Sequence, residues 1–115
     1  MSRLEKRPVV VGSGPAGLFA AHILAVCGAS PILIERGMDV DSRKKAVDSF
    51  FAGGKLDTEC NIQFGEGGAG TFSDGKLNTG TRDTRQRKVL EEFIKHGAPE
   101  EIGYSGKPHI GTDLL

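Results

Sequence analysis

The feature that most constrains this chain is the segment Gly12-Ser13-Gly14-Pro15-Ala16-Gly17, which directly follows a run of three valines. A strand that turns at once into a helix needs glycine at these positions. Gly12 allows the tight turn, Gly14 keeps the backbone open to a ligand, and Gly17 lets the helix pack close to the strand. The spacing therefore predicts a strand, a tight turn and a helix in direct succession.

A second apolar run, residues 31–34, is followed directly by an acidic residue, Glu35, which lies 18 positions after Gly17. At the tip of a second parallel strand, a carboxylate accepts hydrogen bonds from the ribose hydroxyls of an adenosine and repels a 2′-phosphate. The preceding helix would direct its N-terminal N–H groups and the positive end of its dipole at a diphosphate. We therefore predict an α/β fold with a parallel sheet that binds an unphosphorylated adenine dinucleotide, FAD or NAD rather than NADP.

Capping and stop signals mark the expected elements. The first strand covers residues 8–11, and the first helix runs from Pro15 or Ala16 to Cys27, with Gly28 in the left-handed position after it. This helix is apolar on most faces, so we expect it to be buried against the sheet. A third helix is expected from residue 83 or 84 to residue 96.

The second expected helix, residues 43–52, follows a cap formed by Asp41 and Ser42. Its basic run, Arg43-Lys44-Lys45, is interpreted as a solvated face. The opposite side is expected to be buried and consists of Ala46, Val47, Phe50 and Phe51.

A glycine-rich segment between residues 61 and 77 is the second informative region. Four glycines lie within residues 65–70, and such a run exposes consecutive N–H groups and allows positive φ, as in an anion-binding nest. A flexible loop is the alternative interpretation. Phe64 and Phe72 bracket the run and an Asp-Gly turn follows it, which favours an ordered loop.

Composition excludes several classes of partner and site. Fifteen basic and fifteen acidic residues balance, so we expect neither nucleic acid nor a membrane as a partner. Residues 1–7 are too charged to lead a secretory signal, which predicts a cytoplasmic location. The histidines and cysteines lack ligand-like spacing, so no metal site is expected. Cys27 is expected to pack as a small apolar residue. Cys60 is either an inert exposed thiol or a residue near a cofactor, and His109 is a candidate for a functional contact.

The first 35 residues resemble the FAD-binding βαβ unit of the two-dinucleotide-binding flavoprotein superfamily. The whole chain is similar to the start of the poorly characterised bacterial NAD(FAD)-utilising dehydrogenases, on residues 61–77 and 107–112. This resemblance implies that the first turn binds the FAD diphosphate, that Glu35 binds the adenosine ribose, and that Arg36 and the glycine-rich loop lie along the diphosphate towards the flavin. The implied cofactor-binding residues are Gly12, Ser13, Gly14, Pro15, Ala16, Gly17, Glu35, Arg36, Gly67, Gly68, Ala69, Gly70 and Thr71.

The same resemblance implies that residues 1–115 are the N-terminal part of an FAD/NAD(P)-binding Rossmann-like domain. The complete protein would be a flavin-dependent oxidoreductase that takes electrons from NAD(P)H and acts on a small-molecule substrate. Relatives of this kind are several times longer, so we expect the rest of the sheet and the catalytic residues to follow Leu115. An NAD-linked dehydrogenase module and a truncated, non-catalytic binding module are the alternatives. An unfinished sheet edge and exposed apolar faces favour self-association.

Overall fold

The computed structural model describes residues 6–78, 83–111 and 114. They fall into two compact units, within Met1–Thr71 and Phe72–Leu115, and each is described by itself. Within the described residues, no helix has both the length and the apolar character needed to cross a membrane.

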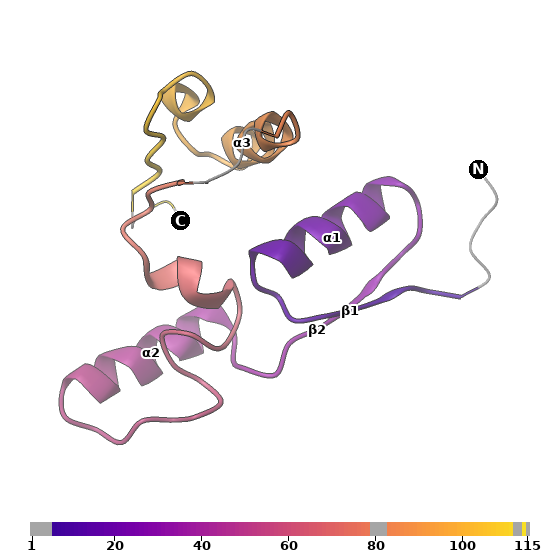
Figure 1. Ribbon diagram of the computed structural model, residues 1–115. Coiled ribbons are helices and arrows are strands. Elements are labelled where there is room, and N and C mark those ends of the chain that lie inside the picture. The colour runs from indigo at the N-terminus through magenta and orange to yellow at the C-terminus, as the bar shows by residue number, and fades with distance from the viewer. Residues whose placement is uncertain (1–5, 79–82, 112–113, 115) are drawn as a thin grey trace. The chain divides into compact units, whose positions relative to one another are not determined.

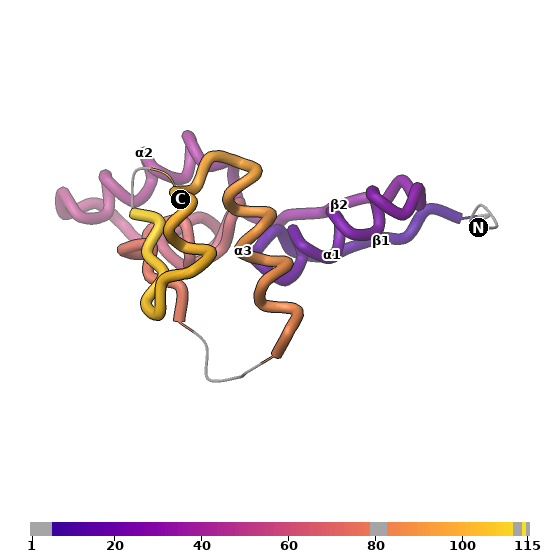
Figure 2. Tube along the Cα trace, turned by 90° about the horizontal axis from the view of Figure 1, so that it is seen from above, coloured from indigo at the N-terminus to yellow at the C-terminus, as the bar shows by residue number. Residues whose placement is uncertain are grey.

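The first unit begins with a βαβ arrangement of β1 (Val9–Val11), α1 (Pro15–Val26) and β2 (Ile32–Ile34). The two strands pair in parallel, with Val9 opposite Ile32 and Val11 opposite Ile34. Parallel neighbours need a crossover connection, and α1 supplies it. Figures 1 and 2 show α1 lying along both strands. The prediction of an α/β fold with a parallel sheet is confirmed, and all three elements lie within one residue of their expected bounds.

The end of α1 has the predicted left-handed glycine. Cys27 caps the helix, Gly28 has φ of +78°, and Ala29 N donates to Leu24 O. The burial predicted for this helix is wrong, because α1 has no buried residue and Cys27 is exposed. Two strands of three residues each offer too small a surface to cover a helix of twelve.

The helix α2 spans Val40–Phe51, so it begins three residues before the expected start. Its cap is Asp39, whose carboxylate accepts from Ser42 N at 3.0 Å, and not Asp41 or Ser42. The Glu66 carboxylate accepts from Val40 N at 2.8 Å and so satisfies a second amide of the first turn. The helix start is therefore fixed partly by a residue from the glycine-rich loop.

The two faces of α2 differ from the predicted ones. Arg43, expected in solvent, is fully buried, whereas Lys44 and Lys45 are exposed as predicted. Val47 is buried as expected, but Phe50 and Phe51 are 39% and 70% exposed. The reason is that residues 61–66 cover the Arg43 side of the helix and give the guanidinium its partners.

The glycine-rich loop also has hydrogen bonds between its own side chains and its backbone. Asn61 Oδ1 accepts from the amides of Gln63 and Phe64, and residues Gly68–Phe72 form the short 3₁₀ helix η1. Cys60, for which an exposed position was one alternative, is 2% exposed.

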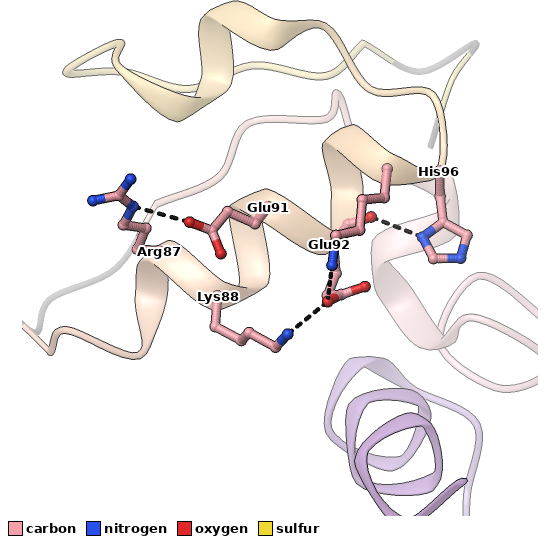
Figure 3. A network of polar contacts seen from close by, with 6 residues as sticks. Arg87, Lys88, Glu91, Glu92 and His96 are labelled. Carbon is pink, nitrogen blue, oxygen red and sulfur yellow. Dashed lines mark hydrogen bonds and ion pairs between the residues drawn. The ribbon is translucent and has the colours of Figure 1, made fainter. Parts of the chain in front are cut away.

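The second unit contains α3 (Gln86–Lys95), the 3₁₀ helix η2 (Glu100–Gly103) and an antiparallel bridge between Lys76 and His109. The helix starts two or three residues after the predicted start, and His96 caps its end. Lys88 Nζ and Lys95 Nζ donate to Glu92 Oε1, each at 2.8 Å. Figure 3 shows Lys88 reaching along the helix to Glu92. These two hydrogen bonds lower the pKa of the Glu92 carboxyl to about 2.

Candidate functional site

The first turn is tight and is held against the end of β2. Gly12 has φ of +94°, a conformation that favours glycine, and its amide donates to Ile34 O at 2.7 Å. A Cβ on Gly17 would lie 1.9 Å from Gly12 O. Gly17 is therefore required by the close approach of α1 to the turn, as the sequence predicts.

The N-terminus of α1 carries no side-chain cap. Gly14 is the N-cap residue, and Pro15, in the first turn of the helix, has no N–H to satisfy. A Cβ added to Gly12 would meet no atom within 4 Å, and one added to Gly14 would meet only Gly68 Cα, at 3.9 Å. There is thus open space beside Gly12, while Gly68 lies next to Gly14. The helix dipole and the amides of the first turn favour an anion at this end.

Glu35 reaches from the end of β2 to the first turn. Its Oε2 accepts from Ser13 N at 2.7 Å and from Ser13 Oγ at 2.9 Å, while its Oε1 accepts from Gly37 N at 2.8 Å. These bonds lower the pKa of Glu35 to about 2, with the Ser13 and Gly37 amides as the main causes. The carboxylate is therefore ionised throughout the neutral range.

The two oxygens of Glu35 differ in what they still offer a ligand. A carboxylate has about four acceptor positions, and Oε2 uses both of its positions on Ser13. Oε1 accepts one bond from Gly37 and keeps capacity for another. The sequence places Glu35 at the strand tip correctly but gives no sign that Ser13 would occupy half of the carboxylate.

The second glycine-rich segment lies directly on the first turn. Gly67 N donates to Ser13 O at 3.0 Å, and a Cβ on Gly68 would lie 3.1 Å from Gly14 Cα. Gly67 and Gly68 have φ of +82° and +66°, so both need the conformational freedom of glycine. The structure therefore brings together two segments that are more than fifty residues apart.

The remaining predicted site residues lie further along this loop or beside it. Ala69, Gly70 and Thr71 follow in η1, and Thr71 Oγ1 donates to Glu66 O at 3.2 Å. The exposed side chain of Arg36 pairs with Glu59 at 2.7 Å, and its guanidinium lies 5.6 Å from the centre of the Phe64 ring.

A cavity of about 420 Å³ lies between α2 and residues 56–64. Buried Cys60 and the side chains of Val47, Phe50 and Phe64 contribute to its wall. Sequence reasoning did not predict this cavity. Over the described part of the chain, no three His, Cys, Asp or Glu side chains are grouped so that they would hold a metal ion.

His109 lies in the second unit. It is exposed, and its Nε2 is 2.5 Å from Asp74 O. This contact lies beside the Lys76–His109 bridge and gives His109 a structural partner.

Residues 6–47 match a protein family described as an FAD binding domain. The matched range contains β1, the first turn, α1, β2, Glu35 and the first two thirds of α2. The match supports FAD binding by this part of the chain.

The chain is also 59% identical over 112 residues to a protein of Clostridium beijerinckii that is described only as uncharacterized. The aligned region covers 97% of this chain and 21% of that protein. The chain thus spans about a fifth of the length of the curated relative that it matches.

Proposed function

We propose that this chain binds the ADP half of FAD at the first turn. The observation that carries the proposal is the uncapped start of α1 beside the ionised Glu35, within the range that matches an FAD binding domain. The proposed cofactor-binding residues are those of residues 12–17, together with Glu35, Arg36 and residues 67–71.

The diphosphate would lie against the amides of Gly14, Ala16 and Gly17, where the helix dipole favours negative charge. Gly12 provides the turn, and Ser13 holds Glu35 in place through two hydrogen bonds. Glu35 would accept a ribose hydroxyl through Oε1, because Oε2 is already engaged. No described atom lies within 4 Å of a Cβ position on Gly12, which leaves open space beside the turn.

We further propose that the segment belongs to a flavin-dependent oxidoreductase. FAD would supply the hydride chemistry, while the protein binds and orients it. The Clostridium beijerinckii relative is about five times longer than the region that aligns with this chain. A protein of that length has room for a substrate domain and for an NAD(P)H site. The dehydrogenase activity, the NAD(P)H donor and the assignment of residues 1–115 to the N-terminal part of an FAD/NAD(P)-binding Rossmann-like domain stay predictions.

Titration of the purified chain with FAD and NADH, side by side, tests the proposal. We expect saturable quenching of flavin fluorescence by the protein and displacement of FAD by ADP. A protein that binds no FAD would contradict the proposal, and one that prefers NADH would favour the NAD-linked alternative. The longer Clostridium beijerinckii relative should bind FAD, and NAD(P)H should reduce that flavin. If this chain binds FAD but the flavin of the relative is not reduced, a non-catalytic binding module is favoured.

A further inference from the structure

Arg43 is a buried cation inside the first unit, and no part of its side chain is exposed. Burial lowers the pKa of its guanidinium, but arginine stays charged in proteins. A buried charge is stable only when polar groups replace the lost water. Because it is covered, Arg43 cannot touch a bound cofactor.

Main-chain carbonyls of the glycine-rich loop provide part of that replacement. Nε donates to Asn61 O at 2.8 Å, Nη1 to Glu66 O at 2.6 Å, and Nη2 to Ile62 O at 2.6 Å. Hydrogen bonds from a charged donor are shorter and about twice as strong as neutral ones. The fork of Arg43 thus fixes three peptide groups of the loop relative to α2.

The peptide between Glu66 and Gly67 connects Arg43 to the first turn. In a trans peptide the C=O and the N–H point in opposite directions, and the described chain has no cis peptide. Glu66 O faces Arg43, so Gly67 N–H points away from it and donates to Ser13 O at 3.0 Å.

The same rule extends the connection by one peptide. Ser13 O faces Gly67, so the N–H of Gly14 points away from Gly67. The guanidinium, the peptide before Gly67 and the peptide before Gly14 therefore form one aligned chain. Aligned hydrogen bonds polarise each other, and the positive end of this chain is the Gly14 N–H.

We propose that Arg43 is a positioning residue for the dinucleotide site. It holds Gly67 against the first turn and polarises the Gly14 amide, which raises the affinity of the turn for a diphosphate. The inference rests on the proposed FAD binding, because it assigns the control of that same site to a residue outside it.

The test compares Arg43→Lys and Arg43→Met with Lys44→Met, a control that removes one exposed charge from the same helix. The dissociation constants of FAD, ADP and adenosine are measured for each folded protein. Loss of charge-assisted bonds should weaken FAD and ADP roughly tenfold to a hundredfold in the Met variant, and less in the Lys variant. Adenosine, which lacks the diphosphate, should bind all variants equally.

A merely structural role would weaken adenosine and ADP by the same factor, and this result would overturn the inference. Unchanged ADP affinity in Arg43→Met would overturn it as well. If Arg43→Met does not fold, the same comparison of ADP with adenosine is made with Arg43→Lys and Gly65→Ala. A Cβ on Gly65 would lie 2.7 Å from Arg43 Cδ, so Gly65→Ala pushes the loop away from the Arg43 side chain. Failure of the unmodified chain to bind FAD or ADP would instead refute the proposed function.

Discussion

Ser13 and Glu35, 22 residues apart, are joined through a single carboxylate oxygen, which accepts from Ser13 N at 2.7 Å and from Ser13 Oγ at 2.9 Å. This pair ties the end of β2 to the first turn. It also means that the acidic residue expected to bind a ribose has a structural role in the absence of a ligand.

Replacement of the carboxylate by an amide tests this double role. In Glu35→Gln, an NH₂ group replaces one of the two carboxylate oxygens and faces a main-chain N–H, so a hydrogen bond is lost. We therefore expect the free energy of unfolding to fall by about 2 kcal/mol. FAD affinity should fall as well, since the ribose loses an ionised acceptor. Urea denaturation and FAD titration measure the two effects, and Glu91→Gln, which removes an exposed carboxylate, is the control. Unchanged stability would show that the Ser13 bonds contribute little.

The stability contributed by Glu35 should depend on pH. Its pKa is lowered from 4.5 to about 2 in the folded chain, so the contribution is fully present above pH 4.5 and is lost as the pH falls towards 2. The difference in unfolding free energy between the unmodified chain and Glu35→Gln should shrink from about 2 kcal/mol at pH 7 to about half that at pH 3. Asp39 and Glu92 also have lowered pKa values, but they are common to both proteins and cancel. A difference that is constant across this range would contradict the assignment.

Gly17 should tolerate no side chain. In Gly17→Ala the Cβ would lie 1.9 Å from Gly12 O, so the backbone has to move, and we expect a loss of about 3 kcal/mol or more. Gly106→Ala is the matched control, because a Cβ there meets no atom within 4 Å and should change stability by less than about 0.5 kcal/mol. Equal melting temperatures for the two variants would show that the close approach of α1 to the turn is not a real constraint.

The variant Gly70→Ala tests whether Gly70 is needed for cofactor binding rather than for folding. A Cβ on Gly70 meets no atom within 4 Å, so Gly70→Ala should keep its stability within about 0.5 kcal/mol. If the loop lies along the cofactor, the added methyl group enters the space of the ligand, and FAD affinity should fall about tenfold, which corresponds to about 1.4 kcal/mol. Parallel thermal denaturation and FAD titration give both values. Unchanged affinity would remove Gly70 from the proposed site.

The elements with short-range signals could be predicted closely from the sequence. The glycine spacing, the proline at the start of α1 and Gly28 after its end act within one turn of the chain, and so β1, α1 and β2 lie within one residue of expectation. The predicted start of α2 was wrong because Glu66, which lies 26 residues after Val40, contributes to the cap of the helix.

Burial could not be predicted in the same way. A run of three basic residues is usually solvated, but the carbonyls of Asn61, Ile62 and Glu66 solvate Arg43 inside the protein. The side chains of Leu18, Ile23 and Val26 in α1 and of Phe51 in α2 are exposed, although the apolar character of these positions favoured burial. The glycines of the candidate site were identified individually, whereas the contact between Gly67 and Ser13 depends on the folded loop.

Binding of the cofactor diphosphate at the first turn can be observed by two-dimensional amide NMR of the ¹⁵N-labelled chain during titration with ADP. We expect the largest shifts on the amides of Gly14, Ala16 and Gly17, with a smaller shift at Ser13. Shifts confined to residues 86–111, or no saturable shift at all, would refute diphosphate binding at this turn.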